Sequence, residues 1–414
     1  MPNVFTQDPE VVKAVKRIAD RTRGREYSDL IDDEGHQYID FVMEGGGVLG
    51  ISLLGYAYAL EQAGIRMLGL GGTSAGSIVA LILASLGPAH EPKAERAVDI
   101  LARMPMGSFM DGDSDARDFT DSMLEKAGMF KLLFKALQCV DNLKDDLGLH
   151  PGDAFEKWLT GELANCGVRT LADLDARLVA KPPGLRHRLN NEGFDAARAC
   201  GKLVVIAADV STETKVDLPR MAPMYWKNPA EVNPARFARA SMSIPLFFHP
   251  FSVAVPQDAA TKEHWRTLGR FDHELPKKAV FMDGGIMSNF PINTFHVSTR
   301  APFSPTFGAK IGFDRNVRNV STPARLLGAI FDSARHTLDF DFINSNPDYK
   351  RLVAHIDVED KHNWLNFNMK PAEQKQLFLA GVLEAETFLC GNDTRPGFDW
   401  ADYKKLRAAL LAAR

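Results

Sequence analysis

The segment Gly72-Thr73-Ser74-Ala75-Gly76 is the part of this chain best suited to nucleophilic chemistry. It follows a strand-like apolar run and precedes a helix-like one, the context that confirms a nucleophile elbow. Small residues flank such a serine because strand and helix pass close to each other there. Unpaired N–H groups at the helix start could stabilise an oxyanion. Ser74 is therefore the candidate nucleophile, although a Gly/Ser-rich turn without chemistry is the plain alternative.

A second glycine run, Gly45-Gly46-Gly47-Val48-Leu49-Gly50, ends the preceding strand-like segment. It fits the dinucleotide-binding pattern G-x-G-x-x-G, which also needs an acidic residue at the end of the next strand. That place holds Leu70-Gly71-Gly72, and no Gly-Lys-Ser/Thr follows to make a P-loop. The pattern therefore disfavours nucleotide binding, and two glycine turns on neighbouring strands favour a shared site.

The elements that position these turns follow from the apolar pattern around them. Tyr38–Met43 and Ile65–Leu70 are short β-prone runs, and Ile51–Ala63 carries apolar residues at helical spacing. Ser77–Leu86 is almost wholly apolar, which predicts a buried helix. The order is strand, glycine turn, helix, strand, serine turn, helix.

Strands and helices also alternate in the rest of the chain. Further strands are predicted at 203–208, 278–282, 307–313 and 351–358, and helices at 11–21, 235–242, from 324, and 373–389. This alternation predicts an α/β fold of three layers, with a mostly parallel central sheet and helices on both faces.

A serine hydroxyl needs a base, and the chain offers two kinds of candidate. Asp283-Gly284-Gly285 ends a buried strand, so the carboxylate could reach over the sheet edge toward a serine. The motif alone is also a common turn. A Ser–Asp–His triad would instead use a late histidine, and none of the four available stands in a recognisable catalytic context. These histidines are His296, His336, His355 and His362.

Composition limits the classes of function. The chain has 414 residues, 45% hydrophobic residues and a net charge of −4, without a long basic run, so we expect no nucleic-acid partner. Its four cysteines lack C-x-x-C spacing, and the acidic cluster at 111–115 lacks the glutamate of a Ca²⁺ loop. The charged N-terminus is no Sec signal, and the uncharged run 67–90 contains the serine turn, which indicates burial rather than a membrane span. We expect a cytoplasmic enzyme.

The ordered set of motifs resembles the patatin-like phospholipase family. The matching motifs are the glycine run at 45–50, the serine turn at 72–76, the block Ala240–Phe248, Asp283-Gly284-Gly285, Asn289-Phe290-Pro291 and a closing helix at 377–389. The resemblance implies a Ser74–Asp283 dyad without histidine that hydrolyses acyl esters of lipids. It also implies an oxyanion hole at Gly45, Gly46 and Gly47 together with Ala75, and no metal or cofactor.

The remaining motif glycines implied by the resemblance are Gly50, Gly72, Gly76, Gly284 and Gly285. One position departs from the pattern, since Leu49 stands where many relatives carry Arg or Lys. The acyl chemistry is unaffected by this difference, but the anchoring of a lipid phosphate is not implied.

The domain division predicted from these motifs is a lead-in at 1–37, the acyl hydrolase domain at 38–390 and a helical tail at 391–414. Within the domain, 87–150 matches the family least and is interpreted as a lid or specificity insertion. Its apolar stretch Met129–Leu137 carries Lys131 and Lys135, which fits either an interfacial helix or an ordinary packed helix. We therefore expect transient, peripheral contact with a membrane surface.

Two other functions fit the same residues. One is a soluble hydrolase of acyl esters or thioesters, which would use the same dyad. The other is a non-catalytic lipid-binding regulator, which the intact serine, aspartate and glycine turn disfavour.

Overall fold

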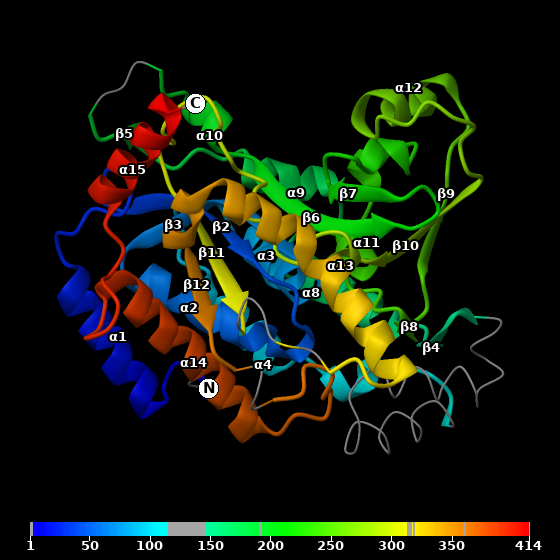
Figure 1. Cartoon of the computed structure of the whole chain (residues 1–414), viewed down its shortest axis with the longest axis horizontal. Coiled ribbons are helices and arrows are strands. Elements are labelled where there is room, and N and C mark those ends of the chain that lie inside the picture. The colour runs from blue at the N-terminus through cyan, green and yellow to red at the C-terminus, as the bar shows by residue number, and fades with distance from the viewer. Residues whose placement is uncertain are drawn as a thin grey trace.

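The structure is a computed structural model that describes residues 3–114, 146–189, 193–312, 317, 319–358 and 362–413. The predicted apolar helix at Met129–Leu137 lies outside the described residues. Figure 1 shows a large twisted sheet with helices packed around it.

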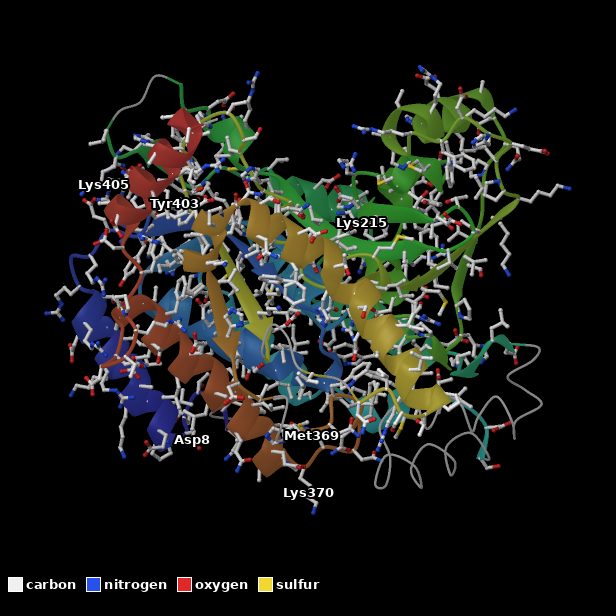
Figure 2. All side chains as sticks on the ribbon, viewed as in Figure 1. Asp8, Lys215, Met369, Lys370, Tyr403 and Lys405 are labelled. Carbon is white, nitrogen blue, oxygen red and sulfur yellow. The ribbon has the colours of Figure 1, made fainter. Side chains whose placement is uncertain are left out.

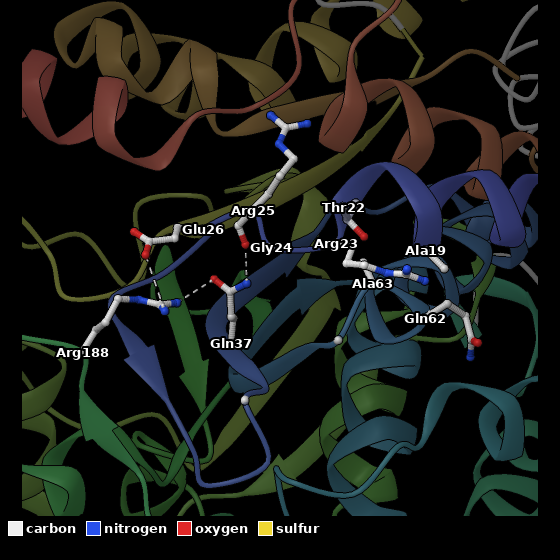
Figure 3. Close-up of a pocket in the computed structure, with 12 residues that line it drawn as sticks. Ala19, Thr22, Arg23, Gly24, Arg25, Glu26, Gln37, Gln62, Ala63 and Arg188 are labelled. Atoms are coloured by element: carbon white, nitrogen blue, oxygen red, sulfur yellow. Dashed lines mark hydrogen bonds and ion pairs between the residues drawn. The ribbon is translucent and has the colours of Figure 1, made fainter.

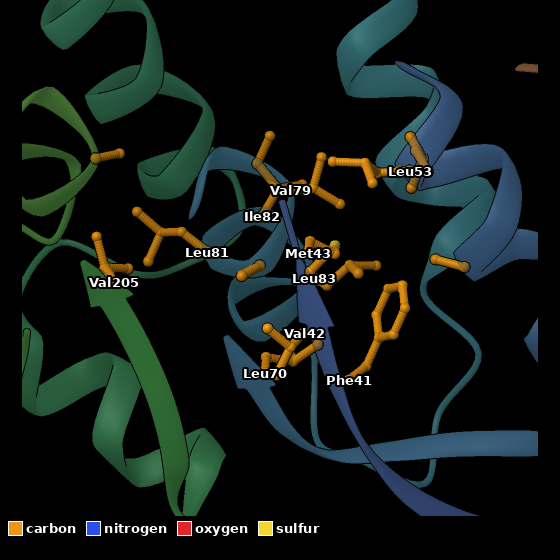
Figure 4. Packing of buried hydrophobic residues seen from close by; sticks show 14 of the residues in the cluster. Phe41, Val42, Met43, Leu53, Leu70, Val79, Leu81, Ile82, Leu83 and Val205 are labelled. Carbon is orange, nitrogen blue, oxygen red and sulfur yellow. The ribbon is translucent and has the colours of Figure 1, made fainter. Parts of the chain in front are cut away.

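The predicted order of elements around the two glycine turns is present. β2 (Gln37–Met43) leads to α2 (Gly50–Gln62), and β3 (Ile65–Thr73) leads to α3 (Ala75–Ser85). Every residue of β3 and nearly every residue of the other three elements is buried, in keeping with their mostly apolar sequences. Figure 4 shows side chains of β2, β3, α2, α3 and β6 (Lys202–Asp209) packed together in this core.

Within the described residues the main sheet has ten strands, with β12-β11-β2-β3-β6-β10-β9 as its principal order. β12 (Val353–Ile356), β11 (Thr306–Ile311), β2, β3 and β6 run parallel to one another. β10 (Lys278–Asp283) runs antiparallel to both β6 and β9 (Phe251–Ala254).

Strands off the principal order add further antiparallel pairs. β7 (Thr214–Leu218) pairs with β6, and β1 (Leu30–Ile31) joins β2 to β5 (Arg186–His187). The prediction of an α/β fold with helices on both faces is confirmed, but the prediction of a mostly parallel sheet is wrong. Antiparallel pairs outnumber parallel ones in the described sheet because hairpin and edge strands surround a parallel centre of five strands.

Helices cover both faces of the parallel centre. The steps β2–α2–β3 and β3–α3–β6 advance in one direction across the sheet, so right-handed crossovers place α2 and α3 on one face. The step from β11 through α13 (Pro323–Ser345) to β12 advances in the opposite direction, which places α13 on the other face. In Figure 1, α13 runs diagonally across the front of the sheet.

The remaining elements connect and extend these layers. They are α1 (Pro9–Thr22), α4 (Ala94–Ala102), β4 (Gly148–His150), α8 (Asp153–Asn165), α9 (Leu171–Leu178), α10 (Ala196–Ala199), α11 (Ala235–Ser241), β8 (Leu246–Phe248), α12 (Ala259–Leu268), α14 (Pro371–Cys390) and α15 (Trp400–Ala412). β4 and β8 form a separate two-stranded parallel sheet.

Helix α14 packs against α2 with backbone touching backbone. A Cβ atom on Gly381 would lie 1.9 Å from the Ser52 carbonyl oxygen, and one on Gly55 would lie 2.1 Å from the Phe378 carbonyl oxygen. No side chain larger than hydrogen fits at either place, so these glycines set the distance between the two helices.

The segments before and after the motifs join the same core. α1 starts at its N-cap Asp8 and packs on α14, which follows Lys370, and both cap residues are labelled in Figure 2. Tyr403 on α15 belongs to the same hydrophobic cluster as residues of α1. The predicted division into a lead-in, a domain and a tail stays a prediction.

Candidate active site

Ser74 lies in a strained turn between β3 and α3. Its φ is 51° and its ψ is −117°, a conformation that non-glycine residues rarely adopt. The turn is tight, since a Cβ on Gly72 would lie 2.4 Å from the Gly76 carbonyl carbon. A Cβ on Gly76 would lie 2.3 Å from the Met43 carbonyl oxygen, so the serine turn packs directly on the end of β2.

Asp283 reaches this turn from the opposite direction. β3 ends at Thr73, opposite Ile206, whereas β6 continues to Asp209. The antiparallel strand β10 pairs with that extension and ends at Asp283, opposite Ala207. The reversal of strand direction therefore brings the carboxylate to the end of β3.

Two serines of the segment that follows β6 and β7 hold both residues in place. The Ser74 N–H donates to the Ser241 hydroxyl oxygen at 2.8 Å, and that hydroxyl donates to the Ile206 carbonyl at 2.6 Å. The Asp283 N–H donates to the Ser243 carbonyl at 2.8 Å. The sequence identified this block only as a motif, and its supporting role was not predicted.

The Ser74 and Asp283 side chains are both buried, with exposed fractions of 4% and 5%. They lie close enough for the Ser74 side chain to lower the pKa of Asp283. Burial raises the pKa of Asp283 above its ordinary value. The positive charge of Arg335 and hydrogen bonds from the Ser74 side chain and the Gly285 N–H lower this pKa in part. The geometry thus combines a serine at an elbow with a carboxylate within hydrogen-bonding reach.

The glycine turn after β2 presents N–H groups beside Ser74. The Gly45 N–H donates to the Asn289 carbonyl at 2.9 Å, and the Val48 N–H donates to the Trp364 carbonyl at 3.0 Å. Between them, the N–H groups of Gly46 and Gly47 have no hydrogen-bond partner among the residues that the structure describes. The same holds, within the described chain, for the N–H of Ala75 at the first position of α3.

Charged and amide side chains surround the far side of this turn. Glu44 accepts hydrogen bonds from the Ile311 N–H at 2.6 Å and from the Asn289 side-chain amide at 3.2 Å. Burial raises the pKa of Glu44 to about 7, although Lys310 and Arg335 lower it. The roles of Glu44 and Arg335 were not predicted, because their partners lie far away in the sequence.

The near side of Ser74 opens into an apolar cavity of about 50 Å³. Apart from Ser74, its lining consists of glycine, alanine, aliphatic, methionine and phenylalanine residues. These are Gly47, Val48, Ala75, Ile78, Met104, Met106, Phe109, Phe155, Met242, Ile244, Phe248 and Phe367. Three of them lie in 87–114, the described start of the predicted lid or specificity insertion.

None of the four late histidines lines this cavity as described. Nδ1 of His296 lies 2.9 Å from the Tyr349 hydroxyl, and Nδ1 of His355 lies 3.4 Å from the Gly312 carbonyl. Among the described residues, no three His, Cys, Asp or Glu side chains gather in a way that could hold a metal ion. Asp111 of the acidic cluster accepts hydrogen bonds from N–H groups of Gly152 and Ala154, at the start of α8.

A larger, polar cavity of about 410 Å³ lies near the ends of α1 and α2 (Figure 3). Arg188 crosses it to contact Glu26 at 3.6 Å and Gln37 at 3.3 Å, and Gln37 also donates to the Arg25 carbonyl. Its lining as described contains neither serine nor cysteine. In the described part of the chain, no helix is both long and apolar enough to span a bilayer.

Comparison with known proteins identifies the family. Residues 41–296 match the family model described as patatin-like phospholipase. The chain is also 29% identical over 352 residues to the uncharacterized protein YqhO of Bacillus subtilis (strain 168), covering 85% of this chain and 98% of that protein.

Two solved structures show a more distant likeness to this chain. VipD from Legionella pneumophila has a TM-score of 0.36 and 13% identity, covering 94% of this chain and 78% of its own. ExoU, in the ExoU–SpcU complex of the Pseudomonas aeruginosa type III secretion system, has a TM-score of 0.37 and 14% identity, covering 91% of this chain and 59% of its own.

Proposed function

The chain belongs to the patatin-like phospholipase family, a family of lipid acyl hydrolases, and we propose that it cleaves carboxylic ester bonds of lipids with a Ser74–Asp283 dyad. The interaction between these two buried side chains, beside an apolar cavity, is the observation that supports this proposal. The proposed class is that of a phospholipase A or lysophospholipase.

In the acylation step, the Ser74 oxygen attacks the ester carbonyl carbon while Asp283 accepts the hydroxyl proton. The carbonyl oxygen becomes an oxyanion that the N–H groups of Gly46, Gly47 and Ala75 stabilise. Gly45 contributes differently, because its N–H already donates to Asn289 and fixes the shape of the turn. The tetrahedral intermediate then expels the alcohol, which takes the proton from Asp283.

Deacylation repeats these roles with water as the nucleophile. Asp283 accepts a proton from water, the resulting hydroxide attacks the acyl carbonyl, and the Ser74 oxygen leaves and recovers the proton. No step requires a metal or a cofactor. The acyl chain lies in the apolar cavity, where its CH₂ groups leave water.

A soluble hydrolase of short acyl esters or thioesters is the second candidate. The cavity supports it, since about 50 Å³ is small compared with typical ligand pockets of about 300–1,000 Å³. On either function the contact with a membrane would be peripheral and transient. The apolar stretch Met129–Leu137, outside the described residues, is the segment proposed to make it.

The test is hydrolysis of a substrate panel by wild type and by Ser74→Ala. The panel contains a diacyl phospholipid, a lysophospholipid, a triacylglycerol, short aryl esters and an acyl thioester. We expect Ser74→Ala to lose at least about 10³-fold in kcat/KM, as removal of an activated serine does. A fluorophosphonate probe should label only proteins that retain Ser74.

Ser85→Ala is the matched control, because Ser85 is buried at the other end of the same helix α3. It should keep wild-type activity and labelling. Equal activity of wild type and Ser74→Ala would overturn the proposal, and vesicle binding without turnover would favour the lipid-binding regulator. Turnover of the soluble esters alone would favour the second candidate.

A further inference from the structure

Asp283 poses an electrostatic problem for the proposed dyad, on which this inference rests. A general base must be ionised, yet a carboxyl group inside a protein tends to hold its proton. Asp283 is buried, and burial is the largest influence on its pKa, in the upward direction. A positive charge close to the site would restore the carboxylate.

Arg335 on α13 brings that charge from the face of the sheet opposite to α2 and α3. One of its terminal nitrogens donates to the Asn289 side-chain oxygen at 2.7 Å and lies 3.4 Å from the Gly45 carbonyl oxygen. Its Nε lies against the Asp-Gly-Gly turn, 3.1 Å from where a Cβ on Gly285 would stand. The guanidinium thus contacts both the glycine turn and the loop that carries Asp283.

The surroundings of Arg335 strengthen the effect of its charge. The rings of Phe331 and Trp364 each lie 5.5 Å from the guanidinium carbon, and such rings attract a cation while excluding water. The buried Nε has no hydrogen-bond partner in the described part of the chain. Charges interact more strongly where water is excluded.

One turn further along α13, Asp339 fixes the helix to the same loop. Its carboxylate accepts hydrogen bonds from the Ser288 hydroxyl and the Phe290 N–H, both at 2.7 Å. Arg335 and Asp339 therefore join α13 to residues 283–290 at two points, which fixes the helix beside the loop that carries Asp283.

We propose that Arg335 is a positioning residue of the dyad, whose charge keeps Asp283 in the carboxylate form and whose hydrogen bond to Asn289 holds the Gly45–Gly47 turn beside Ser74. The other charged side chains around the Gly45–Gly47 turn are Glu44 after β2, Lys310 on β11 and Asp339 on α13. Of the charged groups in the described chain, Arg335 is the one whose charge lowers the pKa of Asp283.

The test measures kcat/KM of a soluble short-chain aryl ester against pH for wild type, Arg335→Met and Arg335→Lys. Loss of the positive charge raises the pKa of Asp283, so the acid limb of the Arg335→Met profile should move up by one pH unit or more. At pH values below the wild-type limb, kcat should fall about tenfold or more while KM changes little. Arg335→Lys keeps the positive charge, so the acid limb of its profile should lie close to that of wild type.

Two controls separate this role from a structural one. Arg325→Met changes an exposed arginine of the same helix and should leave rate and limb unchanged. Glu44→Gln should keep the acid limb, which would assign the limb to Asp283. A limb that disappears in Glu44→Gln would overturn the proposal.

An unmoved acid limb in a folded Arg335→Met protein would also overturn the proposal while leaving the dyad intact. If Arg335→Met does not fold, the Arg335→Lys profile decides. An acid limb of Arg335→Lys at nearly the same pH as that of wild type would support the role of the charge. An acid limb displaced by a full pH unit in Arg335→Lys would contradict that role. Failure of the dyad itself would appear separately, as activity remaining in Ser74→Ala.

Discussion

Ser74 separates two regions that are built from opposite kinds of side chain. One side is the apolar cavity, where methionine, phenylalanine and aliphatic groups meet without directional bonds. The other side is a polar cluster around Glu44, Asp283, Asn289 and Arg335, which hydrogen bonds of defined length hold together.

The two sides should therefore respond differently to change. A buried polar cluster depends on each member, because removing one leaves its partner unpaired. Flexible methionine side chains repack, so the apolar side should tolerate substitution and alter which acyl chain fits. Activity should depend on the polar side and specificity on the apolar side.

The largest expected effect is on the polar side, with Asp283→Asn. An amide cannot accept the Ser74 proton, so kcat/KM should fall by about 10³-fold or more. Alanine at His296, His336, His355 or His362 should retain activity within a few fold. Steady-state kinetics with unchanged circular dichroism would check this, and a comparable loss at one histidine would restore a triad.

An intermediate effect is expected on the apolar side, with Met106→Ala. The enlarged cavity should shift the preference of the enzyme toward longer acyl chains by about tenfold or more, since each methylene contributes about 1–3 kcal/mol. A series of aryl esters from acetyl to dodecanoyl measures this. Met221→Ala is the control, because Met221 is similarly buried but does not line the cavity.

If the two methionine variants give the same chain-length profile, the cavity does not hold the acyl chain. The contrast between specificity and activity would then no longer describe the two sides of Ser74. If Met106→Ala loses all turnover and Met221→Ala does not, the contrast is also contradicted. A substitution on the apolar side should change which acyl chain fits but leave the catalytic step working.

The smallest expected effect is on the stability of the folded protein. The contribution of Glu44 to stability should fall as the pH rises, whereas activity should rise with pH as Asp283 ionises. The pKa of Glu44 is about 7 in the folded protein, above its ordinary value of 4.5. The folded state therefore binds the Glu44 proton more tightly than the unfolded state. Its contribution to stability is present below about pH 4.5 and is lost as the pH rises through 7.

Glu44→Gln should remove about 2 kcal/mol of the decrease in the free energy of unfolding between pH 5 and pH 8. Urea unfolding of wild type and variant at both pH values measures it, with the exposed Glu10→Gln as control. A difference between wild type and Glu44→Gln that is the same at both pH values would show that Glu44 does not bind a proton in this range.

The sequence predicted the elements around Ser74 well because their signals are local. Buried strands such as Ile65–Thr73 are mostly apolar, with Arg66 and Thr73 as exceptions, and the glycines mark the turns by their spacing. Short edge strands such as β7 (Thr214–Leu218) were missed, although Val216 and Leu218 alternate with polar residues. Such brief alternation is a weak signal.

Other features had no local signal at all. The direction of β10 depends on its partner and not on its own composition, so its antiparallel pairing could not be read from Lys278–Asp283. Arg335 is one of several arginines in the chain, and its neighbours Gly45 and Asn289 come from distant segments. Side chains that act through long-range contacts become visible only when the fold is known.

The close contact between Gly55 on α2 and the backbone of α14 has a consequence for the order of events during synthesis. Ribosomes add about 5–20 residues per second, so α2 and the serine turn emerge on the order of tens of seconds before α14 does. During that interval the nascent chain lacks α14, Arg335 and the Trp364 carbonyl that fixes the glycine turn. A partly synthesised chain therefore carries Ser74 without the contacts that hold the Gly45–Gly47 turn beside it. The complete arrangement around Ser74 can form only after α14 has been made.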